Sequence, residues 1–282
     1  MTLVATGELV EAARAAGSAA VAFNVIGVEH AEAIVAGAEA AGAPVILQIS
    51  ENCVRYHGAI EPIAAAALAV AAATDGPVAV HLDHATGVGL VSAAVSAGIG
   101  SVMFDASALD YGSNVAATAE IARWCHDRGV WVEAELGEVG GKDGVHAPGV
   151  RTKPAEAAEY VLTTGVDGLA VAVGSSHAML TKSAVIDLEL IEQIRAEVGV
   201  PLVLHGSSGV PDDVLVEAVR SGLTKINIAT ALNKVFTEAV RSVLAADQRL
   251  VDPRKYMAAG REAVAEEVAR LLGVLRPTSP VQ

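Results

Sequence analysis

The sequence predicts an α/β fold, a (β/α)8 or TIM barrel formed by a single domain. Three observations favour it. Eight short apolar runs rich in β-branched residues recur along the chain, Ala- and Glu-rich amphipathic segments lie between them, and no linker divides the 282 residues. Apolar runs that alternate with helical patterns are typical of a parallel sheet buried on both faces. Eight such repeats in about 250 residues correspond to a closed barrel.

The expected strands are short and follow one another at regular intervals. They cover residues 21–25, 44–50, 77–84, 101–107, 130–137, 168–175, 201–209 and 225–230. The expected helices include 29–41 and 154–164, where Pro154 suits the first turn, and a segment that Pro211 opens and that ends near Gly222. We expect the barrel to span residues 1–275 and a loose C-terminal tail to follow at 276–282.

A doubly wound sheet is the alternative architecture. Such a sheet usually has fewer strands and a glycine-rich nucleotide-binding turn after the first strand. Here the first apolar run is followed by Asn24, Val25, Ile26 and Gly27, without a GxGxxG pattern. The sequence therefore favours the barrel.

Composition limits the possible partners. The chain has 19 Lys and Arg against 33 Asp and Glu, a net charge of −14, so we expect neither a nucleic-acid nor an anionic-membrane partner. A hydrophobic fraction of 52% excludes a disordered chain. Residues 1–9 do not resemble a secretory signal, the apolar runs are too short to span a membrane, and Cys53 and Cys125 fit buried apolar positions. We expect a cytoplasmic protein.

Polar residues gather where the expected strands end, which is where a barrel carries its active site. A single histidine there is more often a hydrogen-bonded rim or core residue than a ligand. Three histidines from different strands beside carboxylates instead indicate a catalytic zinc or cobalt site. Because His81 and Asp83 share one strand face, we expect His84 to be the ligand just past the strand, and His81 to pack or support. The strand-end residues are Asp83, His84, Asp105, Glu133, Glu135, His177, His205 and Asn227.

Several motifs together resemble the class II, metal-dependent fructose-bisphosphate aldolase family. HLDHA at 81–85 and VEAELGEVGG at 132–141 match its two signature stretches. The NIAT form of the motif at 227–230, with the chain length, is most similar to the tagatose-bisphosphate aldolase branch. Five other matching stretches occur in the family's order: AFN at 22–24, SVMFDAS at 101–107, LHGSSG at 204–209, KINIAT at 225–230 and DPRKY at 252–256.

The resemblance implies one catalytic Zn²⁺ per subunit, held by His84, His177 and His205, with Glu135 and Asp105 as auxiliary acids for a more buried ion position. A monovalent cation is a second cofactor to test. Asp83 would remove the C4 hydroxyl proton of the substrate. Zinc would polarise the C2 carbonyl and stabilise the enediolate left by C3–C4 cleavage. A Schiff-base lysine is the other way to stabilise that charge, but the strand ends offer none, and Lys225 is expected to start its strand at the opposite end.

The same resemblance implies two phosphate sites. Glycine-containing loops after the seventh and eighth strands are a recurring phosphate site of barrels. Arg254 matches an arginine that the family supplies from a neighbouring subunit, so we expect a homo-oligomer, a dimer or tetramer. The other expected substrate and phosphate contacts are Asn24, Ser50, Gly174, Ser176, Gly206, Ser208, Asn227, Ala229 and Thr230.

Two positions depart from the family pattern. Asp143 stands where the family usually has a loop glutamate that handles the proton at the enediolate carbon, and Ala229 stands where fructose-bisphosphate members carry Asp or Asn. The expected activity is cleavage of a phosphorylated ketose, a tagatose- or fructose-type 1,6-bisphosphate, to dihydroxyacetone phosphate and an aldehyde phosphate. The alternatives are another phosphorylated ketose or deoxy-ketoacid, or a non-catalytic barrel that is the accessory subunit of a partner aldolase.

Overall fold

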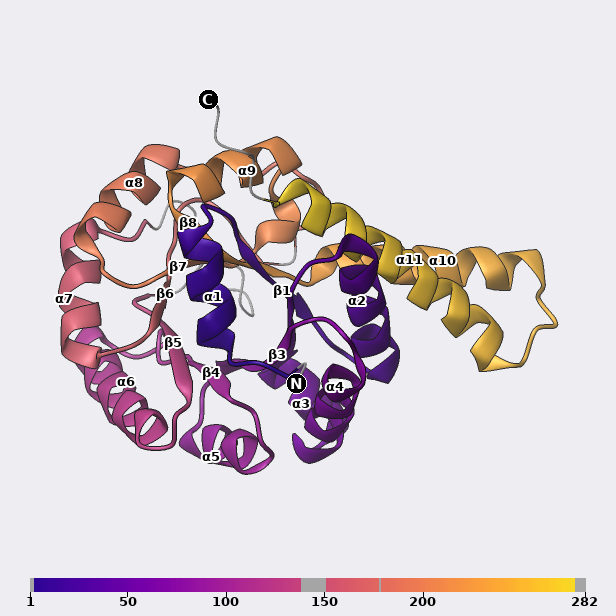
Figure 1. Cartoon of the computed structure of the whole chain (residues 1–282), viewed down its shortest axis with the longest axis horizontal. Helices are drawn as coiled ribbons and strands as arrows, with labels where there is room; N and C mark the ends of the chain where they lie inside the picture. Colours follow the sequence, from indigo (N-terminus) through magenta and orange to yellow (C-terminus); the bar gives the residue numbers. More distant parts are fainter. Residues whose placement is uncertain (1–2, 138–150, 178, 277–282) are drawn as a thin grey trace.

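The computed structural model of the chain is a closed barrel of eight parallel strands inside a ring of helices, as predicted (Figure 1). It describes residues 3–137, 151–177 and 179–276. Each strand pairs with the next along the chain, and β8 closes the barrel on β1. The strands are β1 (Ala20–Asn24), β2 (Val45–Ser50), β3 (Val78–Ala85), β4 (Ser101–Phe104), β5 (Trp131–Glu135), β6 (Gly168–Ala170), β7 (Leu202–Leu204) and β8 (Leu223–Ile228).

Except for α1, the helices surround the strands and contribute apolar residues to one large core. Two of them, α3 and α4, lie between β2 and β3, and a short 3₁₀ turn at Ser207–Gly209 follows β7. The helices are α1 (Thr6–Ala15), α2 (Val28–Ala41), α3 (Glu51–His57), α4 (Glu61–Ala73), α5 (Val88–Ser96), α6 (Tyr111–His126), α7 (Pro154–Thr164), α8 (Leu188–Glu197), α9 (Asp212–Ser221), α10 (Thr230–Ala246) and α11 (Pro253–Val274).

Several strand ends differ from the sequence expectation; β4, for example, ends at Phe104 and not at residue 107. Strands β6 and β7 are shorter than expected, with three residues each. Strand β8 starts at Leu223, so the expectation that Lys225 opens this strand is wrong: it is the third residue. Strand β3 continues to Ala85, so His84 lies within the strand and not past it.

The barrel interior changes in character along its axis. At the amino ends of the strands, Leu9 and Val10 of α1 pack with Ala22, Ile46 and Ala79, so α1 closes this end with an apolar layer. Farther toward the carboxyl ends, the interior becomes polar. Buried polar side chains there are Gln48, His81, Asp83, Glu133, Glu135, His205, Lys225 and Asn227.

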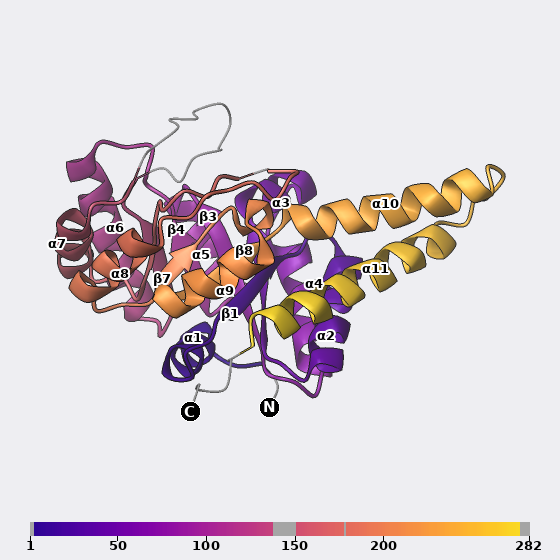
Figure 2. The same ribbon diagram turned by 90° about the horizontal axis from the view of Figure 1, so that it is seen from above.

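Helices α10 and α11 form an antiparallel hairpin whose outer part extends away from the barrel (Figure 2). The inner part of α11 packs against α2 and α10. Gly260 permits the close approach to α10, because a Cβ at this position would lie 2.5 Å from a ring carbon of Phe236. Among the described residues no single helix is long and apolar enough to cross a membrane, and α3 with α4 meets that test only as a pair bent by 114°.

Candidate metal centre and active site

A pocket of about 610 Å³ opens at the carboxyl ends of the strands, where the sequence places the site. Its wall combines the ends of β1, β2 and β3 with the loops after β4, β6, β7 and β8. Twelve of the expected site residues line it: Asn24, Ser50, Asp83, His84, Asp105, Ser176, His177, Gly206, Ser208, Asn227, Ala229 and Thr230.

His84 of β3, His177 in the loop after β6 and His205 directly after β7 come together beside this pocket. The ring centroid of His84 lies 5.2 Å from that of His177 and 4.7 Å from that of His205, and the centroids of His177 and His205 are 5.6 Å apart. One nitrogen of each ring can be chosen so that all three lie within 4.8 Å of one another. This arrangement could hold one metal ion, since three imidazoles with an open position are a common ligand set for catalytic zinc.

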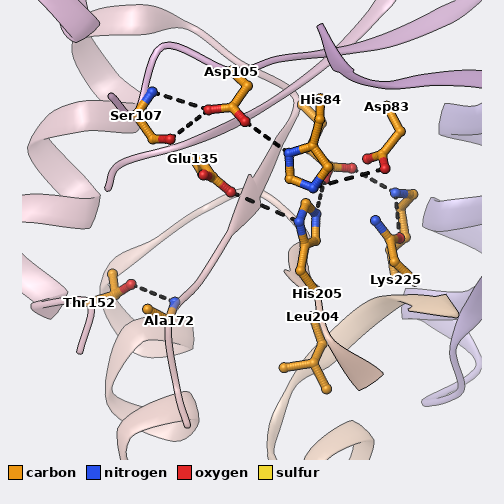
Figure 3. A network of polar contacts seen from close by, with 12 residues as sticks. Asp83, His84, Asp105, Ser107, Glu135, Thr152, Ala172, Leu204, His205 and Lys225 are labelled. Atoms are coloured by element: carbon orange, nitrogen blue, oxygen red, sulfur yellow. Dashed lines mark hydrogen bonds and ion pairs between the residues drawn. The ribbon is translucent and has the colours of Figure 1, made fainter. Parts of the chain in front are cut away.

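A local irregularity of β3 turns His84 toward this centre. The register of β3 with β4 shifts between Leu82 and Ala85. Within this bulge His84 has φ of 52°, a left-handed conformation that costs a non-glycine residue on the order of 1–3 kcal/mol. The bulge breaks the strict alternation of side chains, so adjacent Asp83 and His84 both reach the pocket. His84 Nδ1 lies within hydrogen-bond distance of Asp105 Oδ2, at 2.9 Å, and His84 Nε2 lies 3.9 Å from Asp83 Oδ2 (Figure 3).

Two carboxylates extend the centre inward. Glu135 and Asp105 each offer an oxygen that groups with a nitrogen of His84 within 4.8 Å, so this trio forms a second possible cation position. Glu135 is fully buried, and its Oε2 lies 3.9 Å from His205 Nδ1 (Figure 3). Because His84 belongs to both groups, the two positions share a ligand.

His205 contacts a buried ion pair formed by Glu133 and Lys225. Its Nε2 lies 2.9 Å from Glu133 Oε1, and Lys225 Nζ lies 2.9 Å from Glu133 Oε2. Burial alone would raise the pKa of Glu133, but Lys225 and the hydrogen bond from His205 outweigh it and hold that pKa well below its usual value. Burial and the charge of Lys225 likewise hold the pKa of nearby His81 well below its usual value. Glu133 and Lys225 are both fully buried, so this ion pair lies entirely inside the barrel.

The end of β5 is fixed by a second buried network. Asn114 Nδ2 donates to the carbonyl oxygens of Glu135 and Leu136 at 3.1 and 3.2 Å. Tyr160 donates its hydroxyl to Asn114 Oδ1 at 2.8 Å, which joins α7 to α6 at this point. The backbone that carries Glu135 is therefore anchored by side chains of two helices.

Glycine permits two backbone approaches near the pocket. Gly206 has φ of 69°, and a Cβ there would lie 2.5 Å from the carbonyl oxygen of Ser176, so the loops after β6 and β7 touch. Gly174 has φ of 122°, and a Cβ would lie 2.1 Å from the carbonyl oxygen of Val185. Ser208 Oγ accepts a hydrogen bond from the Ala231 backbone at 3.1 Å, which fixes the amino end of α10 beside the pocket.

The remaining expected site residues lie elsewhere. Gly174 and Arg254 are not among the described residues that line the pocket. His205 and Glu135 are fully buried and lie just behind the pocket wall. Arg254 is the second residue of α11, its side chain is 88% exposed, and it is paired with Asp252. The start of α11 is at the outer end of the hairpin (Figure 2). Asp143 lies outside the described residues.

Three interior residues were given no role in the site from the sequence: Gln48, Lys225, and Glu133, which was noted only as a polar residue at a strand end. Each lies two residues before a residue of the site on the same strand, namely Ser50, Glu135 and Asn227. Side chains alternate along a strand, so residues two apart lie on the same face. This spacing was the sequence signal that could have placed these three residues in the site. Glu51 and Arg55, which pair on α3 at 2.8 Å, also line the pocket without having been expected there.

The family profile described as "Fructose-bisphosphate aldolase class-II" matches residues 4–278. The chain belongs to this family. It is 39% identical over 280 residues to a fructose-bisphosphate aldolase of Geobacillus stearothermophilus, covering 98% of this chain and 96% of that protein. The protein is thus a class II aldolase, which makes it a lyase, and its family is generally metal-dependent.

Solved structures of other aldolases share the whole fold. The YdjI aldolase from Escherichia coli K12 superposes with a TM-score of 0.86 at 31% identity, over 99% of this chain and 100% of that chain. A putative fructose-1,6-bisphosphate aldolase from Coccidioides immitis gives a TM-score of 0.86 at 26% identity, over 96% and 95% of the two chains. The barrel is therefore an architecture that this chain shares with these aldolases.

Proposed function

We propose that this aldolase uses one zinc ion to cleave a ketose 1,6-bisphosphate, of the tagatose or fructose type, reversibly to dihydroxyacetone phosphate and an aldehyde phosphate. The observation that carries the proposal is the meeting of His84 of β3 with His177 and His205, which follow β6 and β7, beside the carboxylate of Asp83. Zinc, when bound, would supply Lewis-acid polarisation of the substrate carbonyl. The fit to zinc rests on the donor set: three imidazoles within reach of one point.

The hydrogen-bond partners of two of these histidines support one choice of metal-binding nitrogen in each ring. Asp105 occupies Nδ1 of His84, so Nε2 would bind. Glu133 occupies Nε2 of His205, so Nδ1 would bind. Partners of this kind orient metal-bound histidines in many sites. Glu135 and Asp105 would hold the ion in the more buried position that they share with His84.

Asp83 is the group that we assign to proton transfer. Its side chain is buried at the pocket wall, and Oδ2 lies 3.9 Å from His84 Nε2. Its Oδ1 has no hydrogen-bond partner within the described residues, so this oxygen is available to accept the proton of a substrate hydroxyl. Asp143 remains our candidate for the second proton transfer, at the enediolate carbon.

The phosphate of dihydroxyacetone phosphate would lie at the amino end of α10. Ala229 and Thr230 begin this helix at the pocket, and Gly206 and Ser208 form the adjoining loop. Helix amino ends present backbone N–H groups and a partial positive charge to an anion. Ser176 completes this side of the pocket, Gly174 shapes the loop behind it, and Asn24, Ser50 and Asn227 would contact the sugar oxygens.

For the distal phosphate we propose Arg254 of a neighbouring subunit, in a homo-oligomer of two or four chains. The support is its place near the outer end of the α10–α11 hairpin, away from the pocket of its own chain (Figure 2). Changing Arg254 to Ala should raise KM for the bisphosphate by roughly 10-fold or more, the value of a charge-assisted hydrogen bond. Mixed oligomers of Arg254→Ala and Asp83→Asn chains should regain activity; no recovery in verified mixed oligomers would contradict donation between subunits.

A substrate panel with purified, zinc-loaded protein tests the proposed function. The panel compares tagatose 1,6-bisphosphate, fructose 1,6-bisphosphate and a phosphorylated deoxy-ketoacid, with release of the three-carbon products as readout and added K⁺ as a second variable. Cleavage of a bisphosphate supports the proposal. Cleavage of the deoxy-ketoacid alone would favour the other substrate class, and no cleavage, with stimulation of a partner aldolase, would favour an accessory subunit.

We also propose a cytoplasmic location. Cys53 and Cys125 are both buried and free, which suits a reducing compartment. Burial raises the pKa of each thiol to about 11, so neither is a reactive thiolate near neutral pH.

A further inference from the structure

We propose that Lys225 is a positioning residue that sets the hydrogen-bonding direction of three groups around the active site: His205, Asn227 and Asn24. It acts on His205 through Glu133, on Asn24 through Gln48, and on Asn227 directly. The inference rests on the proposed function in that His205 is taken as a metal ligand. Its tests below include one that is independent of metal and substrate.

The starting point is the environment of the Lys225 ammonium group. Lys225 is fully buried inside the barrel, two residues before Asn227 on β8. Its Nζ lies 2.7 Å from Asn227 Oδ1, 2.9 Å from Glu133 Oε2 and 3.2 Å from Gln48 Oε1. An ammonium group has three donors and no acceptor, so each of these three partners must present an oxygen to it. Lys225 is thus a fixed source of donors at the centre of the site.

The first consequence concerns His205. With Oε2 directed at Lys225, Glu133 presents Oε1 to His205 Nε2 at 2.9 Å. An ionised carboxylate only accepts hydrogen bonds, so the proton of a neutral His205 ring must be on Nε2. The lone pair is then on Nδ1, which has no hydrogen-bond partner among the described residues and lies on the side of Glu135. This is the tautomer that a metal at the histidine cluster requires.

The second consequence concerns the two amides. Asn227 must turn Oδ1 to Lys225, so its Nδ2 is directed away, and this buried nitrogen has no partner within the described residues. Gln48 likewise turns Oε1 to Lys225, so its Nε2 donates to Asn24 Oδ1 at 3.0 Å. Asn24 can therefore direct its Nδ2 toward the pocket, which Asn24 and Asn227 both line. One cation thereby presents two amide donors to an oxygen-rich substrate.

A purely structural ion pair is the competing explanation, and a double substitution separates the two. In Glu133→Gln protein, Lys225 still demands an oxygen, so the new amide must turn its NH₂ toward His205 Nε2. His205 then has to accept there and carry its proton on Nδ1, which blocks the metal-binding nitrogen. Adding Lys225→Met frees the amide to turn its oxygen back to His205, which restores the original tautomer.

The first measurement is the tautomer of His205 in metal-free protein, from two-bond ¹H–¹⁵N spectra of histidine-labelled samples, assigned with His205→Asn. We expect Nε2–H in the wild type, Nδ1–H in Glu133→Gln and Nε2–H again in Glu133→Gln/Lys225→Met. Nδ1–H in the wild type would overturn the inference, and that result needs no variant to fold. It also needs neither zinc nor a substrate, so it is distinct from a failure of the proposed function.

The second measurement is zinc affinity by competition with a chelator. Glu133→Gln should bind zinc roughly 10–100-fold more weakly, the usual effect of removing the partner of a metal-bound histidine, and the double variant should recover most of the loss. Ser221→Ala is the control, because it removes a partly buried hydrogen bond to Glu192 between α9 and α8, which belongs to neither the pocket nor the Lys225 network. Glu133→Gln with wild-type affinity, or a double variant no better than the single one, would overturn the inference.

The third measurement tests the effect of Lys225 on the amides of Asn227 and Gln48. It uses the double variant, in which we expect the zinc site to be restored. Without Lys225, the amides of Asn227 and Gln48 lose their fixed direction, so KM for the ketose bisphosphate cleaved by the wild type should rise while zinc occupancy stays full. The expected rise is on the order of 10-fold, as for the loss of one or two hydrogen bonds. An unchanged KM at full zinc occupancy would remove the two asparagines from the inference.

Discussion

Glu133 and Glu135 are two buried carboxylates on one strand, and they have opposite surroundings. They are two residues apart on β5, so both point into the barrel. Glu133 meets the ammonium group of Lys225 at 2.9 Å and a histidine on its other oxygen. Glu135, one step nearer the mouth, groups instead with His84 and Asp105 and faces His205 Nδ1 at 3.9 Å.

The contrast separates two layers of the barrel interior. In the lower layer, Glu133, Lys225 and nearby His81, the chain itself supplies the cation that neutralises the carboxylate. The upper layer, formed by Glu135, Asp105 and the three clustered histidines, is arranged for a cation that is not part of the chain. A buried carboxylate is tolerated when a cation accompanies it. For Glu133 that cation is part of the polypeptide, which makes the lower layer a rigid support. For Glu135, Asp105 and the histidines, the proposed cation is the metal ion. Four predictions test this distinction, in order of decreasing effect.

The strongest effect should come from removing a ligand of the upper layer. His177→Ala should lose bound zinc and cleavage together, because two histidines make a poor zinc site. His177 is partly exposed, so the unfolding free energy of the metal-free protein should change by less than about 1 kcal/mol. Metal analysis after dialysis and urea unfolding give the two readouts, with the exposed His126→Ala as control. Full zinc occupancy in His177→Ala would place the metal elsewhere.

Asp83 should affect turnover without affecting either layer. Asp83→Asn preserves the shape of the side chain but removes the proton acceptor, so kcat should fall by about 100-fold or more, the usual contribution of general acid–base catalysis. Zinc content should match that of the wild type. A variant with normal zinc and near-normal turnover would reduce Asp83 to a structural role.

The matched substitutions Glu133→Gln and Glu135→Gln should separate the layers by stability. Glu133→Gln leaves Lys225 buried without a counter-charge, so unfolding of the metal-free protein should become easier by about 3–5 kcal/mol. Glu135→Gln removes a negative charge near Asp105, so its effect without metal should stay within about 1 kcal/mol. Urea unfolding with and without zinc measures both. Equal losses from the two substitutions would remove the distinction.

The weakest effect should be a pH dependence from the lower layer. Burial and Lys225 keep the pKa of His81 well below its usual value, so His81 stays neutral in the folded protein. The unfolded chain takes up this proton below about pH 6.5, so stability should fall between pH 7 and 5, by at most about 1.4 kcal/mol per pH unit. In His81→Asn, unfolding of the metal-free protein should depend less steeply on pH. An identical slope would show that His81 does not cause it.

The barrel and the general composition of its site could be predicted from the amino-acid sequence alone. Apolar runs of period two and helical segments between them are local patterns, so the order of strands and helices followed from them directly. Polar residues mark the ends of the apolar runs, and parallel strands bring these ends together. For that reason Asp83, His84, His177 and His205 could be assigned to one barrel mouth from their positions along the chain.

The orientation of these side chains, in contrast, depends on contacts between distant strands. The bulge that turns His84 depends on the register of β3 against β4, and the role of Lys225 depends on two further strands. Lys225 and Glu133 are 92 residues apart in sequence, and Lys225 and Gln48 are 177 apart. A lysine near a strand start looks remote from the site in sequence, whereas the closed barrel turns its side chain inward, where three oxygen acceptors fix it. Such partners arise from the closure of the sheet, which no local pattern records.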